Sequence, residues 1–557
     1  MPHVPHVSQV PYVPYAPHLL PVLHAPLAQM NAFLHPRGCA ALAPSALVPQ
    51  PQALQSASRY AARAGVALAV TVLSGCASKL LVPTPMPSAQ AVQVASTPVA
   101  PPAWQAPLPH GGSTTTLANW WAQWSDAALV ELMDAAQNES ASLSSARSRI
   151  AQARAALVGA QVTLAPSVNA SAQAGRSAQS PGLPAATSLG VGVQAAWELD
   201  LFGGNRAASS AAQARLDGAQ LGWHEARVAV ASETAATYFS LRHCESSVQL
   251  SQSDAASRAE TARLVALSAQ AGFTAPANAA LARASAADAA SGVRAVQASC
   301  DLAVKSLVAL SGWAEPDLRR KLQANQTVSQ QIRAQTAMFN IASIPADVLQ
   351  QRPDIVSAQR AVHAALLDAR AADARRMPML SLNGNIGLGS VRQAGFTSDG
   401  LTWSLGPIAL TLPILDGGRN AANTQAALAT YDDAVLALRS KARHAVREVE
   451  EALVNLDGSA QRRGDAQAAA AGYQAALAAA QARHSAGLGS LVELEDARRT
   501  ALQAQQSLLG LERDRIAAWV ALYRAAGGGW TAQSPLPMQA QGTAWGHGVP
   551  HSAAAKP

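Results

Sequence analysis

The four cysteines are the residues of this chain with the most distinctive chemistry. They are Cys39, Cys76, Cys244 and Cys300, and their spacing matches neither a zinc site nor a dense disulfide framework. Cys244 and Cys300 fall in Ala-rich segments of helical character, where a cysteine commonly serves as a small packed side chain. We therefore expect packed thiols at these two positions. The alternative is a Cys244–Cys300 disulfide formed in an oxidising compartment.

No other group of side chains has the spacing of a catalytic, cofactor or metal site. Residues 448–451 (Glu-Val-Glu-Glu) lie in a long helical pattern and are expected to form a solvated face. Gly417 and Gly418 precede Arg419, but a tight bend between a strand and a helix explains them better than a phosphate loop. The sequence therefore indicates a protein that is not an enzyme and that binds no cofactor.

The composition favours long, closely packed helices. Apolar residues make up 49% of the 557 residues, whereas aromatic residues make up 4% and charged residues 13%. Such a chain is too apolar for a disordered protein and has too few aromatic residues for a bulky globular core. The net charge of +7 is spread along the chain without a Lys/Arg run, which argues against a nucleic-acid partner.

Cys76 stands at the end of a segment with the features of a secretory signal. Arg59 and Arg63 precede the apolar run 64–73, which is too short to span a bilayer as a helix. The sequence Leu-Ser-Gly-Cys at residues 73–76 also resembles a bacterial lipobox. That resemblance implies cleavage before Cys76, lipid attachment to its sulfur and, because Ala77 follows, sorting to the outer membrane.

The flanking segments differ from the rest of the chain in composition. Residues 1–58 are rich in Pro and His, do not fit a signal peptide and suggest a misplaced start; residues 59–75 form the predicted lipoprotein signal peptide. Residues 76–113 are Pro-rich and are expected to form an extended tether. The tail 531–557 is of low complexity and is expected to be disordered.

A pattern of two strands, a turn with glycine and arginine, and a long Ala-rich helix occurs twice. The first copy starts at Pro166 and the second at Pro378. The strand-to-helix joints are expected at Gly203, Gly204, Arg206, Gly417, Gly418 and Arg419. A recurrence of this kind predicts two tandem copies of one structural unit.

The four predicted strands alternate between apolar and uncharged polar residues, as in residues 167–174 (Ser-Val-Asn-Ala-Ser-Ala-Gln-Ala). Alternation without charge over about ten residues is typical of a transmembrane β-strand, although a soluble half-buried hairpin alternates in the same way. Four strands cannot close a barrel, and a bilayer tolerates no unpaired edge. If these strands span a membrane, several subunits must share one barrel, and a trimer would supply twelve strands.

The helix after each strand pair is expected to turn back on itself. The periodicity predicts helices over about 206–242 and 245–311 in the first copy, and over about 419–456 and 467–524 in the second. Charged residues near these turns are candidates for a gate at this end of the helix pairs, although they also suit an exposed, solvated turn. The candidate gate residues are Asp457, Arg462, Arg463, Asp465, Arg242 and Glu245.

Several segments resemble the TolC-like outer-membrane efflux protein family, in particular its lipoprotein branch of OprM and NodT type. They are residues 344–355 (IPADVLQQRPDI), 412–419 (LPILDGGR), 487–494 (GLGSLVEL) and 522–530 (LYRAAGGGW), with Trp120-Trp121 at the opening. The resemblance covers residues 115 to 530 and implies a first efflux repeat over 114–340 and a second over 341–530.

The fold implied by this resemblance is mixed α and β and mostly α. It is a trimeric transmembrane β-barrel, with four strands from each subunit and twelve in total, continuous with a long periplasmic α-helical barrel. The implied function is a passive outer-membrane duct for small molecules such as drugs, with a periplasmic adaptor and an inner-membrane pump of RND type as partners. A protein-secretion duct of type I and a structural coiled-coil lipoprotein are the alternatives.

Overall fold

The computed structural model describes residues 85–178, 184–324, 345–531 and 534, apart from positions 99, 108–116, 118, 119 and 125. Cys39, Cys76, the segments 1–58 and 59–75, and nearly all of the tail 531–557 lie outside the described residues. The elements are α2 (Ala89–Ser96), η2 (Trp121–Trp124), α3 (Ala127–Glu139), α4 (Ala141–Val162), β1 (Ser167–Ser177), β2 (Ala186–Leu199), α5 (Gly204–Gln270), α6 (Pro276–Ser311), α7 (Glu315–Ala324), α9 (Pro345–Gln350), α10 (Pro353–Ala374), β3 (Met379–Gln393), β4 (Phe396–Thr411), α11 (Arg419–Ser485) and α12 (Leu491–Ala525).

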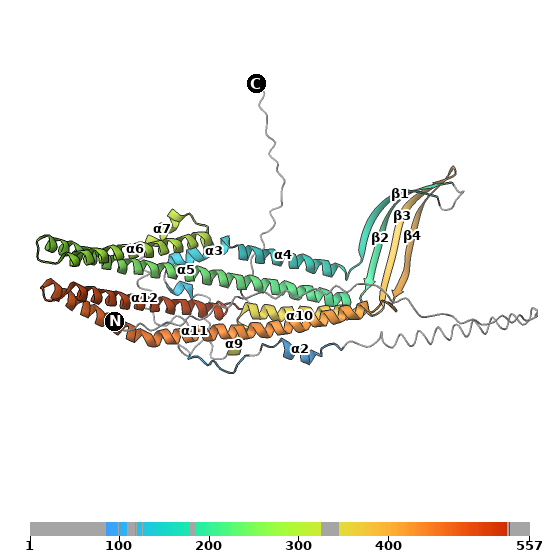
Figure 1. Cartoon of the computed structure of the whole chain (residues 1–557). Coiled ribbons are helices and arrows are strands. Elements are labelled where there is room, and N and C mark those ends of the chain that lie inside the picture. The colour runs from blue at the N-terminus through green and yellow to red at the C-terminus, as the bar shows by residue number, and fades with distance from the viewer. Residues whose placement is uncertain are drawn as a thin grey trace, which may run out of the picture. The chain divides into compact units, whose positions relative to one another are not determined.

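The same order of elements occurs in each half of the chain. A helix (α4 or α10) leads into a β-hairpin, which continues into one very long helix (α5 or α11) and a shorter antiparallel return helix (α6 or α12). The four strands form one antiparallel sheet in the order β1-β2-β3-β4, so that the two predicted hairpins are confirmed and pair with each other. The helices meet the sheet at one end of the strands, and the hairpin turns lie at the other end (Figure 1).

The long helices extend much further than the sequence pattern predicted. α5 and α11 contain 67 residues each, which corresponds to a length of about 100 Å. The predicted ends near Arg242 and Leu456 are wrong, because residues 455–465 are helical throughout. Gly458 and Gly464 interrupt the pattern but not the helix; an interior glycine costs only about 1 kcal/mol, and tertiary packing on either side outweighs it.

The turns of the two helical hairpins lie at residues 271–275 and 486–490 instead. The first contains Gly272 and leads into Pro276, which occupies the first turn of α6. The second contains Gly487, and Ser490 caps α12 by accepting a hydrogen bond from the backbone N–H of Glu493 at 3.1 Å. The tips of the hairpins therefore lie at Gly272 and Gly487.

One face of the second long helix carries apolar residues at spacings of three and four. Its apolar residues are all buried in α11, namely Val435, Leu438, Ala442, Ala445, Val449, Ala452 and Leu456. Spacings of three and four place such residues on one face of a helix. This face packs on α10 and α12.

The largest core cluster lies where α3, α5, α6, α11 and α12 meet. Its bulky members include Trp120, Trp124, Tyr238, Trp519 and Tyr523. Towards the tips the core becomes thinner and consists mainly of alanine, with Val265 and Leu491 as its largest side chains. Within the described part of the chain, every helix is too short or too polar to cross a membrane.

The predicted extended tether is partly helical and is packed on the helical domain. Residues 89–96 form α2, which is capped by Ser88 and packs through Val92 and Ala95 against the cluster shared by α10 and α11. Trp104 is buried in the largest core cluster. The apolar residues between the prolines explain this packing, which a solvated tether would not show.

Candidate functional site

The sheet has one apolar and one polar face. Directly opposed residues share a face, and the register aligns Ala170, Val193, Ile386 and Trp403 in one row and Ala172, Val191, Leu388 and Leu401 in the next. Most of these apolar side chains are exposed, including Trp403 at 73%. The apolar face therefore lacks a covering layer in the subunit.

The opposite face of the sheet carries small and uncharged polar side chains. One row contains Asn169, Gln194, Asn385 and Ser404, and Asn385 donates a hydrogen bond to the Ser404 Oγ at 2.8 Å. Glycines face each other in the centre of the sheet, where a Cβ on Gly387 would lie 2.8 Å from the Val191 carbonyl oxygen. This face is suited to contact with water.

The apolar rows extend over a height that suits a membrane. In β2 they run from Leu189 to Leu199, about 33 Å at 3.3 Å per residue. With the tilt of about 40° that strands adopt in barrels, this length corresponds to an apolar band of about 25 Å, the height typical of outer-membrane barrels.

An aspartate caps each long helix at the joint with the sheet. The Asp200 carboxylate accepts hydrogen bonds from the backbone N–H groups of Asn205 and Arg206, at 3.2 and 2.9 Å. Asp416 accepts from the backbone N–H groups of Gly418 and Asn420, at 2.9 and 3.0 Å. Such caps satisfy N–H groups that the first helical turn leaves without a partner.

The predicted joint residues lie at these two helix starts. Gly203 and Gly418 each precede the first helical residue with φ of 77° and 84°, a left-handed conformation that favours glycine. Gly204 packs so closely on Ala374 that a Cβ would lie 3.0 Å from that side chain. Arg206 forms an ion pair with Asp200 at 3.2 Å.

The groups that donate hydrogen bonds to Asp200 and Asp416 lower the pKa of both carboxyl groups. The backbone N–H groups of Asn420 and Gly418 hold the pKa of Asp416 below its usual range. Burial alone would raise the pKa of Asp200, but hydrogen bonds from Arg206 and Asn205 outweigh it and lower this pKa. Both carboxylates are therefore ionised at neutral pH, and their charges stabilise the positive ends of the helix dipoles.

Arg352 connects the start of the second half of the chain to its end. Its guanidinium donates to Asp354 at 2.9 and 3.0 Å, to Glu448 at 2.8 Å and to the carbonyl oxygen of Ala525 at 2.9 Å. Gly527 approaches this region so closely that a Cβ would lie 2.1 Å from the Gln351 carbonyl oxygen. A cavity of about 470 Å³ opens beside this cluster.

The prediction that residues 448–451 form a solvated face is wrong. Glu448 pairs with Arg352 and Val449 is fully buried. The Glu450 carboxylate accepts hydrogen bonds from the backbone N–H groups of Gln105 and Ala106, at 2.7 and 2.8 Å. These contacts depend on where the N-terminal segment packs, which the acidic run itself does not reveal.

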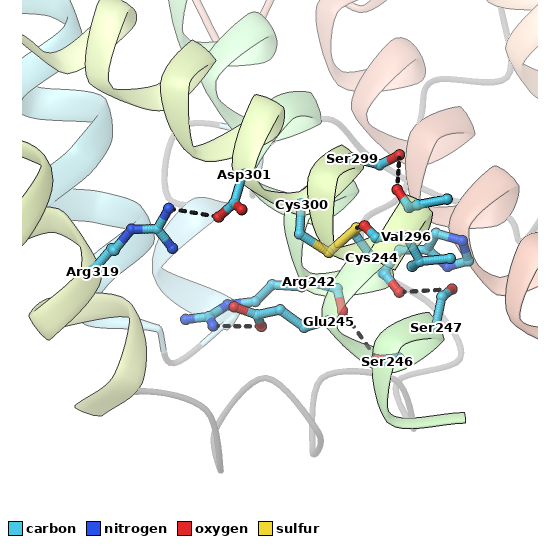
Figure 2. Close-up of a disulfide and its surroundings, with 12 residues drawn as sticks. Arg242, Cys244, Glu245, Ser246, Ser247, Val296, Ser299, Cys300, Asp301 and Arg319 are labelled. Atoms are coloured by element: carbon cyan, nitrogen blue, oxygen red, sulfur yellow. Dashed lines mark hydrogen bonds and ion pairs between the residues drawn. A yellow bond between two sulfur atoms is a disulfide. The ribbon is translucent and has the colours of Figure 1, made fainter. Parts of the chain in front are cut away.

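Cys244 and Cys300 form a disulfide between α5 and α6, so the expectation of packed thiols is wrong and the alternative is correct. The two residues are 56 positions apart with a Cα–Cα distance of 5.5 Å, and Gly272 lies midway between them. Figure 2 shows the disulfide beside the Arg242–Glu245 and Arg319–Asp301 ion pairs. Cys300 also borders the largest core cluster.

The candidate gate residues of the first half lie far from the tip. Arg242 is buried and donates to Glu245 at 2.9 Å, to the Tyr238 hydroxyl at 3.0 Å and to the Leu322 carbonyl oxygen at 3.0 Å. The Tyr238 hydroxyl in turn donates to Asp126. Burial raises the pKa of Tyr238, which stays protonated. These residues stabilise the core rather than a helix end.

The candidate gate residues of the second half lie in the interior of α11. Asp457 accepts a hydrogen bond from Gln461 of the same helix at 2.7 Å. Arg463 faces α12, where burial and the charge of Arg463 lower the pKa of Arg515. Arg462 and Asp465 are exposed. The structure thus brings none of the four to the tip.

A polar network joins the two helical hairpins near their tips. Arg258 of α5 forms ion pairs with Asp254 and with Glu495 of α12, both at 2.7 Å. Ser285 of α6 also donates to Glu495 at 2.5 Å. Arg498 donates to Glu495 at 2.8 Å.

Arg498 also reaches back to the first hairpin. It donates to the hydroxyl oxygens of Ser257 and Thr261, at 3.1 and 2.7 Å, and is only 4% exposed. We call the seven residues of this cluster the tip network; they are Asp254, Ser257, Arg258, Thr261, Ser285, Glu495 and Arg498. The sequence analysis missed it because its halves lie about 240 positions apart, and only the spacing of Glu495 and Arg498, which puts them on one helical face, gave a signal.

Comparison with known proteins gives the family. The model of the outer membrane efflux protein family matches residues 132–313 and 344–528. The chain belongs to this family. Pyoverdine export outer membrane protein OpmQ of Pseudomonas putida is 28% identical over 465 residues, which cover 78% of this chain and 94% of that protein. Outer membrane protein OprJ of Pseudomonas aeruginosa is 36% identical over 187 residues, 33% of this chain and 39% of that protein.

Solved structures agree with the family assignment. A crystal structure of a membrane protein from Pseudomonas aeruginosa is 28% identical, with a TM-score of 0.67 over 77% of this chain and 98% of that one. The outer-membrane channel OprN has the same fold at 23% identity, with a TM-score of 0.65 over 77% of this chain and 97% of that one. This outer membrane efflux protein is thus an efflux channel of the outer membrane that extends into the periplasm.

Proposed function

We propose that three copies of this outer membrane efflux protein form one exit duct, with a shared barrel of twelve strands and a periplasmic barrel of helices. The observation that carries the proposal is the sheet of four strands, which has β1 and β4 as its two edges and exposes its apolar face. A sheet in a bilayer must have every backbone group paired. Pairing β1 of one subunit with β4 of the next would satisfy both edges.

The same arrangement accounts for the two faces of the sheet. The apolar band faces lipid, and the polar face of Ser, Asn, Gln and Gly lines a water-filled pore. α5 and α11 follow β2 and β4 after short joints at residues 200–203 and 412–418 and carry the pore wall into the periplasm. The protein then provides a passage and does no covalent chemistry.

We also propose that the mature chain starts at Cys76 and is anchored through lipid on its sulfur. The segment 59–75 would be the signal peptide, residues 76–113 the N-terminal segment, and residues 114–340 and 341–530 the two repeats. Support comes from the signal-like sequence before Cys76. The packing of Trp104 in the helical core also fixes the far end of the N-terminal segment on the protein.

The partners in this proposal are a periplasmic adaptor and an inner-membrane pump of RND type. A duct of this kind provides only a passage, so the driving force for export must come from its partners. Relatives include a toluene efflux pump outer membrane protein of Pseudomonas putida and a cation efflux system protein of Escherichia coli. We propose small toxic compounds as the exported class, by analogy with such relatives.

Closure of the duct is assigned in this proposal to the tip network. It joins the α5/α6 hairpin to the α11/α12 hairpin only a few turns from Gly272 and Gly487. Opening the tips requires the two hairpins to separate there, which breaks the Arg258–Glu495 ion pair. A largely buried pair of this kind has discrete made and broken states, which suits a gate.

The experiment for the trimer and the pore uses the full chain purified in detergent. Native mass spectrometry should give the mass of three subunits, and gel mobility should change on heating as the trimer dissociates. Reconstitution in a planar bilayer should give ion-conducting channels. A monomeric mass together with the absence of conductance would reject the proposal.

A further inference from the structure

Charged residues on the apolar face of the sheet occur at only one end. In the part of the sheet that the structure describes, the rows from Leu199, Leu380 and Leu410 up to Val191, Leu388 and Leu401 contain no ionisable side chain on this face. The charges of this face are Arg176, Arg392 and Asp399, and all three lie next to the hairpin turns.

The two arginines lie in the same row of the sheet. Arg176 of β1 is paired with Thr187 of β2, which is paired with Arg392 of β3. Since neighbouring strands are about 4.8 Å apart, the Cα atoms of the arginines are about 10 Å apart. Two long side chains at this separation can reach one phosphate from both sides or hold two phosphates side by side.

Within the described residues, both side chains have hydrogen-bonding capacity to spare. Arg392 donates to the Thr397 hydroxyl at 3.3 Å, and among the described residues neither arginine forms an ion pair. Asp399 lies one row further from the turns, opposite Ser390 in the Leu189 row that ends the apolar band. Two arginines and one aspartate leave a net charge of +1 for this end of the face in each subunit.

We propose that Arg176 and Arg392 form a binding surface for a phosphate-bearing lipid headgroup of the outer leaflet. The inference rests on the proposed function, because it requires the apolar face to be embedded in a bilayer. The helices are periplasmic and lie at the opposite end of the strands (Figure 1), so the hairpin turns point to the cell exterior. The arginine row then begins where the apolar band ends, at the level of the outer headgroups.

The chemistry of the row favours a phosphate over a carboxylate or a neutral sugar. A guanidinium donates two parallel hydrogen bonds to phosphate oxygens and is less strongly hydrated than an ammonium group. Thr187, between the arginines, adds a hydroxyl that can donate to the same group. A headgroup with two phosphates could therefore engage both arginines while its acyl chains cover Val191, Leu388 and Leu401.

The experiment measures lipid retained by the purified full-length protein. Native mass spectrometry is performed after incubation with diphosphoryl lipid A or with chemically dephosphorylated lipid A. Wild-type trimers should retain the diphosphoryl form, whereas the Arg176→Gln/Arg392→Gln variant should bind it about tenfold more weakly. The dephosphorylated lipid should bind both proteins equally and weakly.

A matched control removes the same two charges elsewhere. Arg294 of α6 and Arg499 of α12 are exposed, and the Arg294→Gln/Arg499→Gln variant should bind diphosphoryl lipid A like the wild type. Equal binding by the wild type and the Arg176→Gln/Arg392→Gln variant would overturn the inference. So would displacement of the lipid by excess inorganic phosphate, which would indicate a general anion site.

Heat-dependent gel mobility and channel conductance of the same preparations separate this inference from the proposed function. If the wild type forms no conducting trimers, the proposed function fails and the inference fails with it. If the wild type and the variant both form conducting trimers and retain the lipid equally, only the inference fails. If the wild type forms trimers and the Arg176→Gln/Arg392→Gln variant does not, the arginine row contributes to subunit contact. That result would also overturn the inference of lipid binding.

Discussion

Two parts of the helical domain are held together in different ways. The anchor region, which we define as the largest core cluster with the Cys244–Cys300 disulfide and Arg352, contains several Trp and Tyr side chains. The tip region, which extends from Arg258 and Glu495 to the turns of the hairpins, has a core mainly of alanine and the tip network. A buried Trp or Tyr removes far more apolar surface from water than an alanine does.

This difference indicates that the anchor region stabilises the fold, whereas the tip region can move. In the anchor region, covalent and apolar contacts fix the helices where the two halves of the chain meet. In the tip region, the contact between the two hairpins depends on hydrogen bonds and ion pairs, which exchange readily with water. We therefore expect changes in the anchor region to alter the free energy of unfolding, and changes in the tip network to alter channel opening.

The largest expected loss of stability in the anchor region follows from Arg352→Ala. The substitution leaves Asp354 and Glu448 without their shared cation, and removing one partner of a buried ion pair costs about 3–5 kcal/mol. Chemical denaturation followed by the helical circular dichroism signal should show this loss. Arg443→Ala, which removes an exposed arginine of α11, should have little effect, and similar values for the two variants would contradict the anchor role of Arg352.

Removal of the disulfide should have a comparable effect. A loop closed over 56 positions restricts the unfolded chain by about 4 kcal/mol in the chain-entropy model. The Cys244→Ser/Cys300→Ser variant should unfold at lower temperature than the wild type in differential scanning calorimetry. Dithiothreitol should lower the unfolding temperature of the wild type and leave that of the variant unchanged; free thiols at both cysteines in oxidised protein would exclude the bond.

A smaller, pH-dependent effect is expected from His224, which packs between Trp223 and Trp530. Burial, with a contribution from the charge of Arg227, lowers the pKa of His224 to about 4 from 6.5. Above pH 6.5 the imidazole is neutral in both states. Between pH 6.5 and about 4 the unfolded chain binds a proton that the folded chain does not, so the free energy of unfolding falls by about 2–3 kcal/mol over this window.

Denaturation at a series of pH values tests this expectation. His224→Gln should remove the part of the pH dependence that lies between pH 6.5 and 4. If the variant and the wild type lose stability in parallel over this window, other groups must be responsible for the pH dependence.

The sheet and the joints could be predicted because the signals are local. Alternation with a period of two marks the strands, and glycines such as Gly203 and Gly418 mark the places where the backbone needs a left-handed conformation. The aspartate caps at Asp200 and Asp416 belong to the same short segments. Their spacing ahead of the helix would have been enough to assign them.

The ends of the long helices could not be located from the sequence in the same way. Gly458 and Gly464 weaken the helical pattern, and only the packing of α11 on its neighbours shows that the helix continues through them. The disulfide and the tip network also join residues that are far apart in the sequence. Their existence depends on the antiparallel register of the hairpins, which composition and periodicity do not fix.

The most direct test of the account is the conductance of a Glu495→Gln channel. Glutamine keeps the shape of the side chain but loses the charge that pairs with Arg258. Because this pair is largely buried, its loss should weaken the contact between the two hairpins near their tips. The control is Glu493→Gln, because Glu493 pairs with Arg483 of the same hairpin. In planar bilayers, Glu495→Gln should open more often than the wild type and Glu493→Gln should not; equal open probability for all three proteins would contradict closure by the tip network.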